Sequence, residues 1–324
     1  MPTRRRTAAG LGFRTFFGLV VLLAGIGASV LTVAGFLGDL WWPFDLAADH
    51  RMQYFGVLVL AAILYGLAFG RGTAVVFAAA AAVNAVVLAP LWLAGTTTPP
   101  EGAPTVRIVL YDAERAAASR PLLLRWLADL DADVVVLQGT TPEWSDPIAE
   151  ADLPFEPVIE PAPGVLEGTT VLASVPAEGE LVTVRRSTFA VVEVDGDTPY
   201  TLVAVESNRP DSQAAHEARL DLFSAAADRA TQTERPVVVV GSLGTTRWSK
   251  AFSVFTDAGL RSTEDGFGYQ PTWMRADLPL IGPYFGIPVD HILVGPGIRV
   301  VDRSVGPELA GPHRPVTATL HLRP

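Results

Sequence analysis

The chain has 324 residues, of which 49% are hydrophobic, and this length could hold two ordinary domains or one domain plus membrane spans. It contains no cysteine, which excludes disulfides and thiolate metal sites. The formal net charge is −10, and residues 103–324 hold 18 basic and 30 acidic residues, a net of −12; nucleic-acid binding normally shows a basic patch or stripe, so we expect no nucleic-acid partner.

Three stretches near the N-terminus carry no charged residue: 15–38, 52–70 and 72–100. Each is long enough to cross about 30 Å of hydrocarbon at about 1.5 Å per residue. Three such stretches within one hundred residues are rare in soluble domains, and the first far exceeds the apolar core of a cleaved signal peptide. We therefore predict a membrane domain over residues 1–95 with three transmembrane helices, and we expect Asn84 to make an interhelical hydrogen bond rather than to serve transport.

The placement of arginines predicts the orientation of these spans. Four arginines precede the first span and Arg71 lies in the turn between the second and third, whereas the first loop carries Asp39, Asp45 and Asp49. Positive residues are enriched on the cytoplasmic side of membrane proteins. The sequence therefore predicts a multi-pass protein of the cytoplasmic membrane with its N-terminus inside and its C-terminal domain outside.

Residues 96–104 form a Thr-, Pro- and Gly-rich linker, and a folded domain is expected over 105–324. Buried or alternating apolar runs predict its strands, and apolar spacing at three and four residues predicts its helices. The expected strands are 106–111, 134–137, 169–173, 182–194, 201–205, 237–240, 289–294 and 316–322; the expected helices are 120–130, 214–230 and 248–258. Strands in pairs with helices between them favour a layered α/β protein with two packed sheets.

Several short strings follow one another in a distinctive order. They are Asp131–Gln138 (DADVVVLQ), Pro236–Gly244 (PVVVVGSLG), Pro271–Trp273 (PTW), Val289–Leu293 (VDHIL) and Gly311–Val316 (GPHRPV). In order and spacing they resemble the endonuclease/exonuclease/phosphatase superfamily, and the three spans resemble its membrane-anchored bacterial branch. The resemblance implies an α/β fold in which three transmembrane helices precede a two-layer β-sandwich flanked by helices. It also implies hydrolysis of phosphate esters with Mg²⁺ or a similar hard ion.

Several residues that the resemblance aligns with family metal ligands have lost the ligating group. Gly139 stands where the family has a glutamate, Ser242 and Pro312 stand where it has aspartates, and Gly244 stands where it has an asparagine. The resemblance leaves two remnant candidate ligands, Asp112 at a family asparagine and Glu206 near a family histidine. A hard divalent ion needs anionic oxygen ligands, so we expect no bound metal or other cofactor.

Asp290 and His313 are retained, and the resemblance implies that they form a hydrogen-bonded pair. A histidine with a carboxylate neighbour can act as a general acid or base; the structural alternative is that the pair only braces the last turn. Two interpretations follow. The first is a pseudoenzyme that acts in binding or assembly, with a protein partner on its external domain or its spans. The second is an active Mg²⁺- or Mn²⁺-dependent phosphodiesterase or phosphatase that uses Asp112, Glu206, Asp290 and His313.

Overall fold

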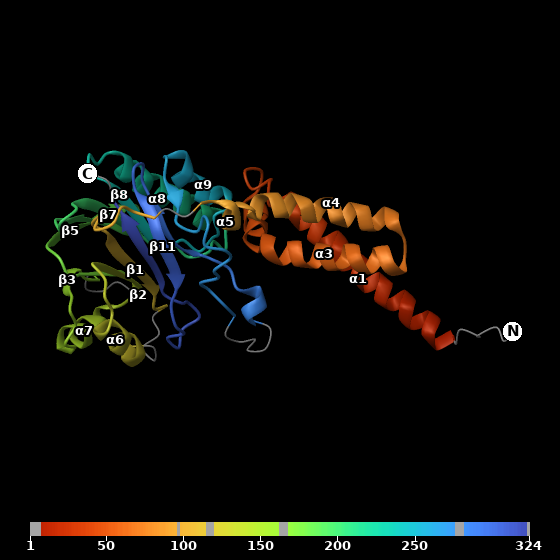
Figure 1. The fold of residues 1–324 in the computed structure, drawn as a ribbon, viewed down its shortest axis with the longest axis horizontal. Coiled ribbons are helices and arrows are strands. Elements are labelled where there is room, and N and C mark those ends of the chain that lie inside the picture. The colour runs from red at the N-terminus through yellow and green to blue at the C-terminus, as the bar shows by residue number, and fades with distance from the viewer. Residues whose placement is uncertain (1–7, 96–97, 115–119, 162–167, 276–281, 323–324) are drawn as a thin grey trace. The chain divides into compact units, whose positions relative to one another are not determined.

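The computed structural model describes residues 8–95, 98–114, 120–161, 168–275 and 282–322 (Figure 1). The chain divides into two compact units, Met1–Ala89 and Pro90–Pro324. The short helix α5 (Pro90–Leu93) belongs to the second unit and precedes the segment 96–104 that the sequence predicts as a linker, of which residues 96 and 97 lie outside the described part.

The first unit consists mainly of α1 (Ala8–Ala34), α3 (Arg51–Ala68) and α4 (Arg71–Leu88), with the short α2 (Trp42–Ala47) and a 3-10 turn, η1 (Ala48–His50), between α1 and α3. Among the described residues, three helical stretches are long and apolar enough to cross a membrane: Arg14–Ala34, Trp42–Ala68 and Arg71–Leu88. The Asn84 side-chain amide in α4 donates to the hydroxyl of Thr32 in α1 at 2.8 Å. This contact is the interhelical hydrogen bond that the sequence predicts.

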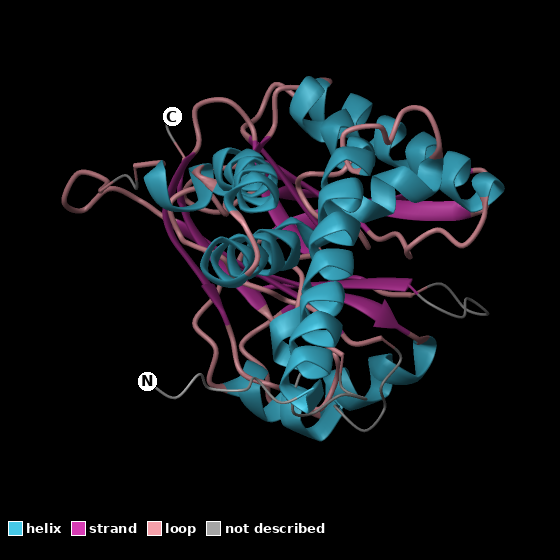
Figure 2. Cartoon of the chain, turned by 90° about the vertical axis from the view of Figure 1, so that its right-hand side faces the viewer, coloured by secondary structure: helices cyan, strands magenta, loops and turns pink. Residues whose placement is uncertain are grey.

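The second unit contains two six-stranded mixed sheets, coloured by secondary structure in Figure 2. One sheet has the strand order β11-β12-β1-β2-β4-β3, and the other has the order β5-β6-β7-β8-β10-β9. The first comprises β1 (Val106–Asp112), β2 (Val134–Thr140), β3 (Glu156–Ile159), β4 (Gly168–Ala173), β11 (Arg299–Val305) and β12 (Val316–His321). The second comprises β5 (Ala177–Val184), β6 (Ser187–Val194), β7 (Tyr200–Val205), β8 (Val237–Ser242), β9 (Arg261–Ser262) and β10 (Asp290–Val294).

Helices cover the outer faces of both sheets. Apolar side chains of α8 (Gln213–Thr231) and α9 (Lys250–Asp257) pack with β6, β7 and β8, and those of α6 (Arg120–Ala128) and α7 (Ser145–Glu150) pack with β1 and β2. Figure 1 shows these two helix pairs on opposite sides of the sandwich. Between the sheets, a separate core is formed by inward residues such as Ile108, Val136 and Val240. The predicted α/β sandwich flanked by helices is therefore confirmed.

The structure corrects two details of the predicted element pattern. The apolar stretch 182–194 belongs to two antiparallel strands, β5 and β6, because the chain turns at Arg185, whose φ of 55° lies in the left-handed region. The edge strands β3, β9 and β11 and the short helix α7 were not predicted. Strands β3 and β11 are only partly buried, so their apolar residues give a weak periodic signal, and β9 has only two residues.

Candidate functional site

The residues singled out in the sequence meet at one end of the sandwich. Asp112 is the last residue of β1, Asp290 is the first of β10, and His313 lies in the turn before β12. Ser242 ends β8 and pairs directly with Asp290 in the antiparallel ladder. Because β1 and β12 belong to one sheet while β8 and β10 belong to the other, the cluster forms only when the two sheets pack together.

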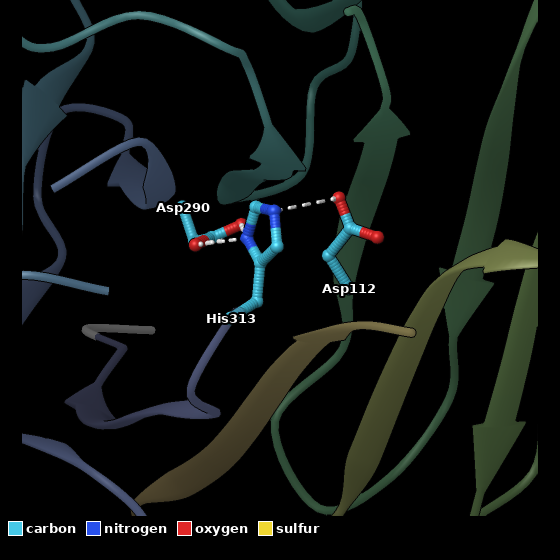
Figure 3. Close-up of side chains that lie close together, drawn as sticks. All are labelled: Asp112, Asp290 and His313. Atoms are coloured by element: carbon cyan, nitrogen blue, oxygen red, sulfur yellow. Dashed lines mark hydrogen bonds and ion pairs between the residues drawn. The ribbon is translucent and has the colours of Figure 1, made fainter. Parts of the chain in front are cut away.

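The His313 imidazole lies between two carboxylates (Figure 3). Its Nδ1 atom lies 2.9 Å and 3.1 Å from the two carboxylate oxygens of Asp290. Its Nε2 atom lies 3.7 Å from Oδ2 of Asp112 and 4.0 Å from Oε1 of Glu114. Asp290 is buried and His313 nearly so, so solvent weakens these charge interactions very little.

The surroundings of His313 favour its charged form. Burial by itself lowers the pKa of His313, but the charge of Asp290 and the hydrogen bond to it, with smaller effects of Asp112 and Glu114, raise the pKa to about 9. At neutral pH the ring is therefore an imidazolium that holds a proton on each nitrogen. In this state His313 can donate a proton or a hydrogen bond through Nε2, but it cannot accept a proton as a general base.

The pKa values of the two buried aspartates shift in opposite directions. Burial raises the pKa of Asp112, and the charge of Asp290 adds to this effect against the opposing influence of His313 and of hydrogen bonds from Ser242 and the Glu114 amide. Burial also works to raise the pKa of Asp290, but the charge and hydrogen bond of His313, with hydrogen bonds from Thr272 and Ser242, lower it overall. The Asp290 carboxylate therefore remains ionised at neutral pH.

The backbone at Gly139 and Gly244 leaves little room for any side chain, including those that the resemblance leads us to expect at these positions. Gly139 has a φ of +64°, and a Cβ atom there would lie 2.7 Å from the amide nitrogen of Glu114 and 2.8 Å from Oδ1 of Asp112. Gly244 has a φ of +60°, and its Cβ would lie 2.7 Å from the carbonyl oxygen of Ser207. Both values lie in the left-handed region, which glycine adopts without strain. A side chain at either position would therefore strain the local backbone.

The cluster opens into a cavity of about 210 Å³. Glu206 follows β7 and lines this cavity, and its Oε2 atom accepts a hydrogen bond from the Gly139 amide at 3.1 Å. Glu114 also lines this cavity and is half-exposed there. The sequence reasoning missed it, although it follows Asp112 by only two residues.

The remaining walls of the cavity include Arg209, Trp273, Ile287 and Val289. Pro312 lies next to His313, and its carbonyl oxygen accepts from the Met274 amide at 3.0 Å.

Two further residues that the sequence did not mark as functional hold the cluster in place. The Thr272 hydroxyl accepts hydrogen bonds from the amides of Val289 and Asp290, both at 3.1 Å. The side-chain oxygen of Gln138, at the end of β2, accepts from the Ser242 amide at 2.5 Å and so connects the two sheets directly beneath the site. Thr272 belongs to the PTW string, but its role depends on a contact that only the folded chain creates.

By distance alone, Asp112, Asp290 and His313 are a candidate metal site, because one ligand atom of each lies within 4.8 Å of the others. The donor set does not fit a hard divalent ion, however. Both oxygens of Asp290 contact His313, and Oδ1 of Asp112 accepts a hydrogen bond from the Glu114 amide at 2.8 Å. Mg²⁺ prefers six oxygen ligands in near-octahedral geometry, which this arrangement does not offer.

His291 follows Asp290 but lies on the other side of β10, as strand alternation requires. Its Nε2 atom lies 2.8 Å from the carbonyl oxygen of Thr245, and its Nδ1 atom lies 3.3 Å from Oε1 of the buried Glu264. Glu264 also faces Arg303 at 3.7 Å. Burial works to raise the pKa of Glu264, but the interactions with His291, Arg303 and Arg247 lower it to about 2. This cluster is a buried charge network outside the cavity.

A family model described as the endonuclease/exonuclease/phosphatase family matches residues 93–315. A search of curated proteins found no match.

Solved structures share the fold at low sequence identity. An endonuclease/exonuclease/phosphatase from Beutenbergia cavernae is 18% identical with a TM-score of 0.52, over 67% of this chain and 72% of that chain. A protein of the same description from Bacteroides vulgatus is 15% identical with a TM-score of 0.54, over 68% of this chain and 100% of its own. A 3′ phosphatase from Neisseria, solved with a product DNA hairpin, is 16% identical with a TM-score of 0.52, over 66% of this chain and 98% of its own.

Proposed function

Because the chain belongs to the endonuclease/exonuclease/phosphatase family, we propose that it is a membrane-anchored member whose external domain acts in binding or assembly without metal-dependent hydrolysis. The anchoring is supported by the three long apolar helices. The external placement of the domain is supported by the arginines that flank the first span and by Arg71 in the turn before the third. A protein partner on this domain or on the spans, rather than nucleic acid, fits the net charge of −12 over residues 103–324.

The observation that carries the proposal is the position of the His313 ring between Asp290 and Asp112. In this arrangement the His313 ring already contacts both oxygens of Asp290 and faces Oδ2 of Asp112, the carboxylates that a metal ion would need. At Gly139 and Gly244 the left-handed backbone could not carry a ligand side chain without strain. The family fold is retained, and in this proposal the Asp290–His313 pair braces the last turn instead of taking part in metal-dependent hydrolysis.

The second candidate function is an active phosphoric ester hydrolase with a rearranged metal site. It is favoured by one observation, that Asp112, Glu114 and Glu206 line the same cavity as His313. Together with the adjacent Asp290 they supply four carboxyl groups in or beside the cavity, and hard divalent ions bind to such oxygens. This candidate would use Mg²⁺ or Mn²⁺.

Hydrolysis assays on the full chain in detergent separate the two candidates. The purified protein is incubated with a generic phosphodiester and a generic phosphomonoester, with Mg²⁺, with Mn²⁺ or with a chelator. We expect no metal-stimulated hydrolysis above that of the Asp290→Asn variant. Metal-stimulated turnover that disappears in Asp290→Asn would instead establish the hydrolase.

A further inference from the structure

The second unit begins with a short segment that is bonded to a distant loop. The helix α5 starts two residues after α4 ends at Leu88. The amide of Gly266 donates to the carbonyl oxygen of Pro90 at 3.2 Å, and the amide of Gly268 donates to that of Leu91 at 2.7 Å. The chain that leaves the third apolar helix is therefore held against residues 266–268 by backbone hydrogen bonds.

A second contact continues from this loop to the rim of the cavity. The Tyr269 hydroxyl donates to the carbonyl oxygen of Gly286 at 2.7 Å. Gly286 directly follows the 3-10 turn η4 (Gly282–Phe285). Ile287, the next residue, lines the cavity and exchanges two backbone hydrogen bonds of 3.0 Å with Trp273. The two residues that follow η4 therefore connect this turn to the α5-bonded loop and to the cavity wall.

Exposed apolar side chains gather at these two places. Within the described part of residues 90–322, six large hydrophobic side chains are exposed. Four of them lie on α5 or η4: Trp92 at 54%, Leu93 at 81%, Tyr284 at 77% and Phe285 at 44%. The other two, Leu122 and Leu181, are isolated on α6 and β5. Exposed apolar groups scattered singly are ordinary, but a cluster marks an interaction surface.

We propose that these four side chains, here called the aromatic rim, dock into the headgroup interface of the bilayer that holds the spans. The proposal rests on the membrane anchoring proposed above and adds a lipid contact for the external domain. Trp and Tyr favour the membrane interface, where their rings reach apolar surroundings and their polar atoms stay hydrated. Chain continuity places α5 beside the end of the third span, so the interface is within reach of the aromatic rim.

The charge of the domain decides which kind of membrane contact this is. With a net of −12 over residues 103–324, the domain is repelled by anionic headgroups. Docking must therefore come from the apolar side chains, without a requirement for anionic lipid and with little sensitivity to salt. Because Ile287 lies two residues beyond Phe285, docking also brings one wall of the cavity to the lipid surface.

The absence of cysteine from the sequence allows a direct test. Single variants of the full chain, Tyr284→Cys and Phe285→Cys, are labelled with an environment-sensitive fluorophore and reconstituted in phosphatidylcholine vesicles that contain a lipid-borne quencher near the headgroup. Leu181→Cys is the matched control, since that side chain is also exposed on the same unit. Val86→Cys, on the exposed face of α4, reports the anchoring itself.

We expect quenching at positions 284 and 285 about threefold stronger than at position 181, and unchanged in high salt. Quenching at 86 but not at 284 or 285 would overturn the docking and leave the anchoring intact. No quenching at any position would overturn the anchoring on which the proposal rests. A label at 284 that is shielded from an aqueous quencher but not reached by the lipid quencher would assign the aromatic rim to a protein partner and so overturn lipid docking.

Discussion

The Nδ1 atom of His313 lies 2.9 Å from Oδ2 of Asp290, at the point where the last turn of one sheet meets the first residue of a strand in the other. This contact joins two parts of the chain that are 23 residues apart and leaves the opposite ring nitrogen directed at Asp112. Its electrostatic consequence, an imidazolium that persists above neutral pH, can be measured.

We expect the stability of the protein to decrease as pH rises through the alkaline range. The folded-state pKa of His313 is raised to about 9 from 6.5, so the folded protein binds this proton more tightly than the unfolded chain does. The stabilisation is fully present below pH 6.5 and is lost as pH rises to about 9, a change in unfolding free energy of about 3 kcal/mol. Thermal unfolding followed between these pH values should show the loss.

The His313→Gln variant is the control for this pH dependence. It has no ring to titrate, so its unfolding temperature should change less than that of the wild type between pH 6.5 and 9. Asp290→Asn removes the main charge that holds the proton and should move the transition to lower pH. Parallel pH profiles of the wild type and His313→Gln would show that His313 is not an imidazolium.

The thermal stability of the unmodified chain should barely respond to Mg²⁺ or Mn²⁺. An ion present at a hundred times its dissociation constant would add about 2.7 kcal/mol to the unfolding free energy. The cluster lacks the donor set for such binding, so unfolding temperatures with millimolar metal and with a chelator should coincide, as measured by differential scanning calorimetry. A saturable metal-dependent increase in the wild type would support the hydrolase interpretation.

Ser242→Asp should create metal dependence where the wild type has none. The new carboxylate would lie beside Asp112 and Asp290, with which Ser242 forms hydrogen bonds. Like charges at this spacing destabilise the fold unless a cation neutralises them. We expect the variant to be less stable than the wild type in chelator and to regain stability with Mn²⁺, whereas Ser242→Asn, its uncharged control, should not respond.

Restoring a side chain at Gly139 should damage the fold. Gly139→Ala combines left-handed backbone strain with a Cβ only 2.7 Å from the Glu114 amide, which we expect to cost about 3 kcal/mol of stability. The matched control is Gly259→Ala, because Gly259 has a φ of +88° with no atom within 4 Å of the added Cβ; strain alone should cost about 1 kcal/mol. Equal unfolding temperatures for the two variants would show that the close contacts of the added Cβ at position 139 do not lower the stability.

Glu264→Gln should destabilise the protein strongly. The change leaves His291 and Arg303 facing a neutral group in a buried network, and removing one partner of a buried ion pair costs about 3 kcal/mol or more. Glu178→Gln, at an exposed position of β5, is the control and should have almost no effect. Denaturant unfolding of the two variants at neutral pH gives the comparison.

The same network predicts an acid-sensitive component of stability. The pKa of Glu264 is lowered to about 2 from 4.5. The contribution of ionised Glu264 to the free energy of unfolding is therefore fully present above pH 4.5 and is lost as pH falls toward 2. A wild-type acid transition that remains the same in Glu264→Gln would mean that other carboxylates control it.

The sequence alone determined the features that arise from local pattern. Uncharged runs long enough to cross a membrane appear as the three apolar helices, and the apolar runs at 106–111, 134–137 and 237–240 appear as β1, β2 and β8. Buried central strands were predictable because they are apolar on both faces and need no information about their neighbours. The spaced strings around Gly139, Ser242, Asp290 and His313 identified the family, because their residues and their order along the chain are local features of the sequence.

Only the tertiary structure decided the features that depend on distant partners. The edge strands β3 and β11 take their extended form from pairing with β4 and β12, which a half-polar local pattern does not encode. The contact of Glu206 with the Gly139 amide spans 67 positions, and that of Gln138 with the Ser242 amide spans 104. Whether His313 carries a charge also depends on packing, because the balance between burial and the Asp290 carboxylate exists only once the two sheets meet.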